Sequence, residues 1–104
     1  MASLPQELVE YHRSSKPLYC EISVQPWRCE FWPLNEVLKH NRNYMVPEFA
    51  PGYLGFATSG GGEMYTFSPS GRIVCLAFVG MSPKEELLVA ETWQEFEDML
   101  NNAL

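Results

Sequence analysis

Residues 56–79 read FATSGGGEMYTFSPSGRIVCLAFV, in which three runs of strand-forming residues are separated by two segments rich in glycine and serine. The second separator, Ser68 to Gly71, has proline in its second position and glycine in its fourth, an order typical of a type I turn. It predicts a hairpin between residues 64–67 and 73–78. Because residues 73–79 are almost uninterruptedly apolar, we expect the second strand of this hairpin to be central in a sheet and covered on both faces.

The first separator contains three consecutive glycines at positions 60–62 and could be mistaken for a phosphate-binding loop. Such a loop lies between a strand and a helix whose N-terminus faces the anion, usually with a lysine or hydroxyl on the phosphates or the metal. Here the glycines lead into EMYTF, a strand-like segment, no lysine follows, and Glu63 would repel phosphate. We interpret the glycine run as a turn that gives the chain backbone freedom between two strands.

In the N-terminal half, the spacing of apolar residues predicts both strands and helices. Alternating apolar residues predict strands at 18–24 and 27–32, the second with Trp27, Cys29 and Phe31 on one face. A short helix is expected from Pro5 to about residue 14, since proline is tolerated in a first turn, and a second at 34–41. The two prolines within residues 44–53 predict a loop.

The C-terminal segment has the clearest helix signal. Thr92 and Glu95 are spaced as in a capping box, in which the hydroxyl accepts from the Glu95 amide and the carboxylate reaches back. Apolar residues then recur at helical spacing to about Asn102, and a short strand is expected at 87–90 before them. We predict one α+β domain over residues 1–104, with a mostly antiparallel sheet of about five strands flanked by helices.

Charge is distributed unevenly along the chain. With 7 basic and 13 acidic residues the formal net charge is −6. Residues 1–47 hold five acids and five bases, whereas residues 48–104 hold eight acids and only two bases, Arg72 and Lys84. Such a field disfavours nucleic acid and anionic membranes as partners and favours a basic protein. An ordinary solubilising surface has the same composition, so charge alone does not decide between the two interpretations.

The residues that carry chemistry do not form a recognisable catalytic or metal-binding motif. Cys20, Cys29 and Cys75 include no C-x-x-C pair and are expected to be reduced and buried. His12 and His40 fall in or near the N-terminal helices, outside any nucleophile motif. A small hydrolase stays open as an alternative only if the fold brings Cys20 or Cys29 beside a histidine. We predict no catalytic residues, no cofactor and no metal.

The chain also lacks the usual signals for membranes and export. Its longest clean apolar run, IVCLAFVG at 73–80, has the length of a strand and is too short to span a bilayer. The N-terminal residues MASLPQELVEYHR lack the basic start and apolar stretch of a secretory signal. We therefore expect a cytoplasmic protein without a membrane partner.

Four segments together suggest a family. They are LPQELVEYHRSS at 4–15, EFWPLNEVLKHN at 30–41, YLGFATSGGGEMYTF at 53–67 and VAETWQEFEDML at 89–100. Their order and spacing resemble the SUKH superfamily, which includes yeast cell-wall assembly regulators and bacterial immunity proteins. The chain differs from the family pattern in having SSK at 14–16 in place of the usual Asn-Gly and Gly-Glu at 62–63 in place of Gly-Asp. The helix that usually precedes the Leu-Pro segment is expected to be missing.

The resemblance implies a non-catalytic protein that binds and neutralises a toxin, often a nuclease. An acidic surface would speed association with a basic toxin and add specificity. The residues expected to contact the partner are exposed acids, with one aromatic anchor: Glu63, Glu85, Glu86, Glu91, Glu95, Glu97 and Tyr53. The alternative is a regulatory scaffold that binds an endogenous basic protein, and the oligomeric state is left open.

Overall fold

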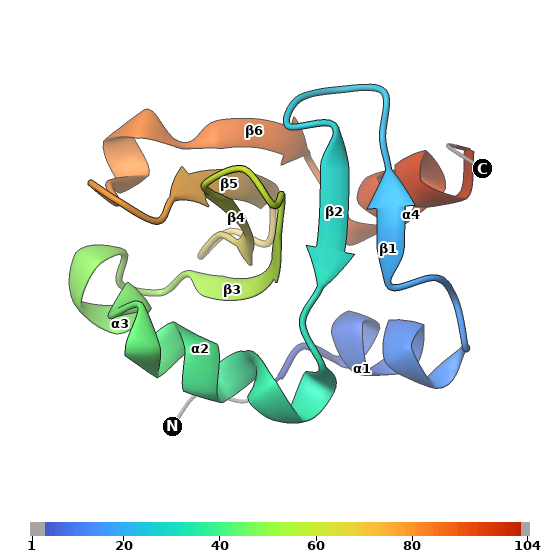
Figure 1. The fold of residues 1–104 in the computed structure, drawn as a ribbon, viewed down its shortest axis with the longest axis horizontal. Helices are drawn as coiled ribbons and strands as arrows, with labels where there is room; N and C mark the ends of the chain where they lie inside the picture. Colours follow the sequence, from blue (N-terminus) through green and yellow to red (C-terminus); the bar gives the residue numbers. More distant parts are fainter. Residues whose placement is uncertain (1–3, 103–104) are drawn as a thin grey trace.

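The computed structural model describes residues 4–102, which fold around one antiparallel sheet (Figure 1). Each strand pairs with the next along the chain, so the sheet is a meander. Its strands are β1 (Tyr19–Glu21), β2 (Arg28–Phe31), β3 (Leu54–Thr58), β4 (Glu63–Phe67), β5 (Ile73–Ala77) and β6 (Leu87–Ala90). The sheet has six strands rather than about five, because both short N-terminal segments pair.

The helices complete an α+β domain, as the sequence predicts. They are α1 (Gln6–Arg13), α2 (Val37–Asn43), α3 (Val46–Phe49) and α4 (Trp93–Asn102), with 3₁₀ turns at Leu34–Glu36 and Pro83–Glu85. The prediction of a loop over residues 44–53 is wrong at α3. Pro47 lies in the first turn of this helix, where a missing N–H is tolerated, and Met45 before it has φ 60°.

The predicted hairpin is confirmed as β4 and β5. Met64 pairs with Leu76 and Phe67 with Ile73, and the amide of Gly71 donates to the carbonyl of Ser68 at 2.9 Å to close the turn. Residues 73–76 of β5 are all buried, so this strand is covered on both faces as expected. The extended apolar run therefore marks the centre of the fold.

Aromatic side chains from the sheet and from α4 form the core. The Phe56 ring on β3 lies 4.9 Å from Phe67, 5.8 Å from Trp93 and 5.9 Å from Phe96, measured between ring centroids. The capping box of α4 is confirmed in one half, because the Glu95 amide donates to the Thr92 hydroxyl at 3.1 Å. The Glu95 carboxylate, however, accepts from the amide of Glu91 at 3.3 Å, one residue earlier than predicted.

The strands at the N-terminal edge are shorter than predicted. β1 contains only Tyr19–Glu21, and the side chains of Leu18 and Val24 are exposed. Trp27 does not face the core with Cys29. It closes a tight loop, in which the Trp27 amide donates to the carbonyl of Val24 and the Ile22 amide donates to that of Trp27, each at 2.8 Å. This turn takes Trp27 out of the strand and into solvent.

A buried asparagine fastens α2 to the sheet. The side-chain Nδ2 of Asn41 donates to the carbonyls of Val37, at 2.7 Å, and Gly55, at 2.8 Å. Its Oδ1 accepts from the Gly55 amide at 2.8 Å. The amide side chain thus pairs with the β3 backbone at the position where its register with β4 shifts. A Cβ at Gly55 would collide with the Met64 side chain, so any larger residue there would force Met64 to move.

Candidate protein-binding surface

The glycine run is a closed turn in which two of its three glycine amides are already hydrogen-bonded. The amide of Gly61 donates to the Ser59 hydroxyl and the amide of Gly60 to the Thr58 hydroxyl, both at 3.0 Å. Gly60 and Gly62 have φ of 79° and 108°, which explains why glycine is needed at both positions. Because serine and threonine hydroxyls occupy two of the amides that would hold a phosphate, and the run leads into β4 rather than a helix, the interpretation as a turn agrees with the structure.

Beside this turn lies a groove at the open end of strands β4, β5 and β6. Two adjoining hollows of about 270 and 410 Å³ share Glu63 and Leu87 as lining residues. Trp27 borders the first hollow, and Val79 and Glu85 border the second. We call this surface, defined by Trp27, Glu63, Val79, Glu85 and Leu87, the β4–β6 groove.

The groove is open because α4 covers only part of one face of the sheet. Side chains at Glu63, Tyr65 and Phe67 alternate onto the same face of β4. The ring of Tyr65 lies 5.6 Å from Phe96, and that of Phe67 lies 5.4 Å from Trp93, so α4 packs over this half of the strand. Glu63, at the start of β4, lines the groove instead.

Apolar side chains give the groove the character of an interaction surface. Val79 is 90% exposed, Trp27 54% and Leu87 37%. Trp27 also has φ 77°, a left-handed conformation rarely adopted by bulky residues. Backbone strain of this kind is concentrated at functional sites. The sequence alone did not indicate that Trp27 and Val79 are contact residues. Pro26, directly before Trp27, does signal the end of the strand pattern.

The groove carries negative charge. Its lining includes the carboxylates of Glu63 and Glu85 and, within the described chain, no lysine or arginine. Glu63 is half-buried rather than exposed as predicted, because it accepts a hydrogen bond from the Ser59 hydroxyl at 2.7 Å at the edge of the turn, while Glu85 is exposed as expected. At the floor, burial raises the pKa of Cys75, and the Glu63 charge raises it further. The groove therefore combines one hydrogen-bonded and one exposed carboxylate with apolar surface.

Three other predicted contact residues surround Arg72. The Glu86 carboxylate accepts from the Tyr53 hydroxyl and from the Arg72 guanidinium, both at 2.6 Å, and Glu91 lies 4.0 Å from Arg72. The bond to Glu86 raises the pKa of Tyr53. Glu86 and Tyr53 are half-buried, so the prediction that Glu86 is an exposed acid is wrong. Its charge is neutralised within the fold, because Arg72, one of the two bases of the C-terminal half, lies beside it.

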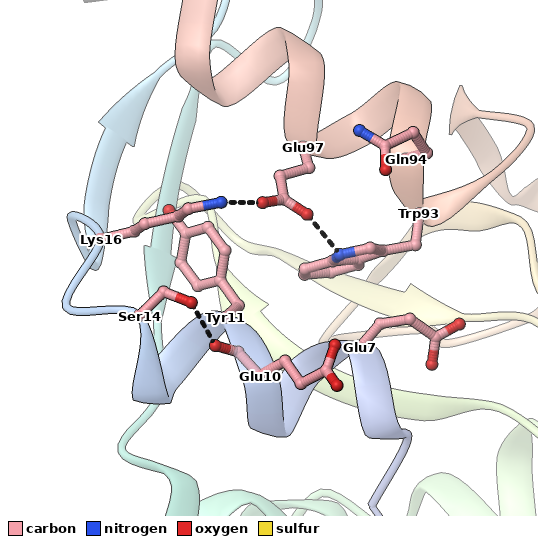
Figure 2. A pocket seen from close by; sticks show the side chains of 8 residues that line it. All are labelled: Glu7, Glu10, Tyr11, Ser14, Lys16, Trp93, Gln94 and Glu97. Atoms are coloured by element: carbon pink, nitrogen blue, oxygen red, sulfur yellow. Dashed lines mark hydrogen bonds and ion pairs between the residues drawn. The ribbon is translucent and has the colours of Figure 1, made fainter.

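Glu97 lies in a separate cleft of about 260 Å³ between α1 and α4 (Figure 2). Its carboxylate accepts from the Trp93 indole nitrogen at 3.0 Å and forms an ion pair with Lys16. Glu97 is therefore also not an exposed acid, and it ties α4 to the segment after α1. Glu91 and Glu95 are exposed as expected, outside the β4–β6 groove. The groove thus contains two of the seven predicted contact residues, Glu63 and Glu85.

A comparison with known protein families finds a match that spans the fold described above. The SMI1/KNR4 family (SUKH-1) matches residues 1–102. The chain belongs to the SUKH-1 family. A comparison with curated proteins found no match. The SUKH family is generally non-catalytic and includes immunity proteins, so at the family level this chain is a protein-binding module.

The cysteines of this SUKH-1 domain lie in the core, in an environment that suppresses their reactivity. Burial raises the pKa of Cys20, Cys29 and Cys75, which keeps each thiol protonated and weakly nucleophilic. Within residues 4–102 neither histidine hydrogen-bonds to a cysteine. His40 lies against Trp32 with ring centroids 4.5 Å apart, and its Nε2 is 3.3 Å from Glu36. This geometry disfavours the small hydrolase with a Cys–His pair.

Two further properties of the SUKH-1 domain concern metals and membranes. No three His, Cys, Asp or Glu side chains in the described part of the chain are grouped so that they could hold a metal ion. Among its described helices, none has both the length and the apolar character needed to cross a bilayer.

His12 makes the stability of the SUKH-1 domain dependent on pH. Its Nε2 is buried without a hydrogen-bond partner among the described residues, and burial lowers its pKa below the ordinary 6.5. The unfolded chain then binds the proton more tightly, so stability is lost as pH falls below about 6.5. We expect urea unfolding to show this decline and His12→Leu to reduce it. If the free energy of unfolding of His12→Leu falls as steeply with decreasing pH as that of the wild type, this assignment is contradicted.

Proposed function

We propose that this SUKH-1 protein is an immunity protein that binds a basic protein toxin, a nuclease being one candidate, and blocks it in the cytoplasm. The observation that carries the proposal is the β4–β6 groove, in which exposed Trp27 and Val79 flank the carboxylates of Glu63 and Glu85. Nucleases need basic surfaces to bind the phosphates of their substrate, so an acidic groove is complementary in charge to their active site.

The two kinds of side chain in the groove serve different steps of binding. The carboxylates attract a basic surface over a distance and raise the association rate. Tryptophan buries a large area on contact and is enriched among the residues that dominate binding energy. Neither role needs a catalytic group, in agreement with the generally non-catalytic character of the family.

The first experiment identifies the partner. The tagged full chain is purified from its own host, and the proteins that elute with it are identified. We expect a basic protein in stoichiometric amount that is toxic when expressed alone and harmless together with this chain. A basic partner without toxicity would instead support a regulatory scaffold. Recovery of only ribosomes and chaperones would contradict both functions.

Neutralising the groove should slow association with that partner. We expect Glu63→Gln combined with Glu85→Gln to lower the association rate constant by about tenfold at low salt, because electrostatic attraction is lost. Glutamine keeps an acceptor for the Ser59 hydroxyl at position 63. The measurement is stopped-flow association at several salt concentrations, and the difference should diminish as salt screens the charges.

The matched control removes the same charge elsewhere. Glu30 on β2 and Glu48 on α3 are exposed and do not line the groove. Glu30→Gln combined with Glu48→Gln changes the net charge by the same amount and should leave the association rate near that of the wild type. Equal slowing by both double variants would show that total charge matters and the groove does not.

A further inference from the structure

Two cysteines lie directly opposite each other on the first two strands. Cys20 of β1 and Cys29 of β2 are register partners in the antiparallel pair. Side chains of directly opposed residues lie on the same face of a sheet, and here that face is the core, where Cys20 is 2% and Cys29 0% exposed. Both thiols are free in the structure, so the fold holds two reduced sulfurs side by side.

The backbone geometry of this pair fits a disulfide. Two residues to one side of the cysteines, the amide of Ile22 donates to the carbonyl of Trp27 at 2.8 Å. Two residues to the other side, the amide of Phe31 donates to the carbonyl of Leu18 at 2.7 Å. Since hydrogen-bonded pairs alternate with non-bonded ones, the cysteines form a hydrogen-bonded pair, with Cα atoms about 5.5 Å apart. A disulfide joins Cα atoms about 4.4–6.8 Å apart, so the strands already have the required spacing.

The surroundings keep the pair reduced while the strands stay together. The Cys20 thiol donates to the carbonyl of Pro17 at 3.6 Å and lies 3.8 Å from the Tyr11 hydroxyl. Burial raises the pKa of Cys20 and of Cys29, and the thiolate is the form that reacts with oxidants. Among the described strands, however, β1 pairs only with β2 and has three residues (Figure 1). Short edge elements open locally, which gives Cys20 access to water.

We propose that Cys20 and Cys29 are a redox-sensitive pair, which a peroxide oxidises to a cross-strand disulfide. When β1 opens, Cys20 loses its proton and the thiolate attacks one oxygen of hydrogen peroxide. The O–O bond breaks, and hydroxide leaves and takes up the proton, which gives water and a sulfenic acid at Cys20. The Cys29 thiolate then attacks the Cys20 sulfur, and the second hydroxide leaves with the Cys29 proton as water. Two thiols are oxidised to one disulfide, and one peroxide is reduced to two waters.

The bond would fasten the loop that presents Trp27. Residues 21–28 lie between the two cysteines, and Trp27 among them borders the β4–β6 groove. A disulfide at the base of this loop prevents β1 from separating from β2 and leaves the charge of the groove unchanged. Disulfides in a reducing compartment are usually transient and serve redox sensing, which suits a pair that opens to oxidants only with its strand. The inference goes beyond the proposed function and needs no partner.

Peptide mapping of the full chain tests the bond. The reduced protein is treated with hydrogen peroxide under native conditions, denatured, alkylated with iodoacetamide and digested with trypsin. Cleavage after arginine and lysine, except before proline, places the three cysteines on separate peptides, residues 14–28, 29–39 and 73–84. We expect the first two peptides to be joined by a bond that dithiothreitol breaks, and Cys75 to carry the alkyl group.

Two single variants provide matched controls. Cys20 and Cys75 are each 2% exposed, so Cys20→Ser and Cys75→Ser remove one buried thiol each. We expect Cys20→Ser to abolish the linked peptides and Cys75→Ser to retain them, and the alanine variants replace any serine variant that fails to fold. Peroxide should also slow hydrogen exchange of the Ile22 amide at least about tenfold in the wild type. In Cys20→Ser this slowing should be absent, although methionines are oxidised equally.

Several results would overturn the inference. They are the absence of linked peptides, a link between Cys29 and Cys75 instead, a bond that forms only after unfolding in urea, and oxidation of Cys20 to sulfinic acid without a bond. Unchanged exchange at Ile22 in the linked protein would refute the fastening of the loop. None of these outcomes depends on the partner, so failure of the purification leaves the redox pair standing, and failure of the redox pair leaves the proposed function standing.

Discussion

Asn41→Ala is expected to lower the free energy of unfolding by about 3–5 kcal/mol, a large part of the stability of a domain this small. Asn41 is only 5% exposed, and its side chain makes three hydrogen bonds to backbone groups of α2 and β3. Alanine removes these bonds and leaves the amide and carbonyl of Gly55 buried without their partner. An unsatisfied buried polar group costs about 1–3 kcal/mol.

The substitution should also loosen the sheet locally. Gly55 lies where the register between β3 and β4 shifts, and the Asn41 side chain hydrogen-bonds both its amide and its carbonyl, so it supports the strand at this irregular position. Chemical denaturation measures the global effect, and hydrogen exchange at Gly55 measures the local one. Asn43→Ala is the matched control, because Asn43 is exposed on the same helix and should change stability by less than about 0.5 kcal/mol.

Asn41→Asp separates hydrogen bonding from side-chain size. Aspartate keeps the acceptor for the Gly55 amide but places an oxygen where Nδ2 donates to the carbonyls of Val37 and Gly55. Repulsion and burial raise the folded-state pKa of the new carboxyl above its unfolded value. Stability should therefore be best at acid pH and fall as pH rises through that folded pKa. Wild-type stability in Asn41→Asp at neutral pH would refute the role assigned to Asn41.

The central hairpin and α4 were predictable because local signals and tertiary packing agree there. The apolar run at 73–79, the Ser-Pro-Ser-Gly turn and the Thr92 cap each specify the same structure that the core requires. Membership of the SUKH family was likewise predictable, since four segments of the sequence follow the family's core pattern in order. The family match over residues 1–102 confirms it.

Three features could not be predicted because each depends on contacts between distant residues. Asn41 acquires its role only when α2 is placed against β3, which no local pattern specifies. Trp27 alternates with Cys29 in the sequence, but the hydrogen bonds of the loop at Val24 turn it outward. From the sequence, Glu86 and Glu97 are expected to be free surface acids, but the structure places Arg72 beside Glu86 and Lys16 beside Glu97. Charge counting therefore overestimated the acidic surface and missed the apolar part of the groove.

Trp27→Ala is expected to weaken binding of the proposed partner by about 30-fold or more while changing stability by less than about 1 kcal/mol. A central tryptophan at an interface contributes at least about 2 kcal/mol, and 1.4 kcal/mol corresponds to tenfold in affinity. The side chain is 54% exposed in the free protein, so little packing is lost when it is removed. Calorimetric titration of the purified partner and urea denaturation measure the two effects.

Trp27→Gly sharpens the test, because it acts on the backbone as well as on the side chain. The φ of 77° costs an L-residue about 1–2 kcal/mol, which glycine avoids, and this gain offsets the greater freedom of glycine in the unfolded chain. We expect near-wild-type stability together with the full loss of affinity. Phe49→Ala is the control, since Phe49 on α3 is also 54% exposed and lies outside the groove. If Phe49→Ala weakens binding as much as Trp27→Ala does, the partner does not bind at the groove. If Trp27→Gly unfolds the protein instead, Trp27 serves the fold and the strained loop has no binding role.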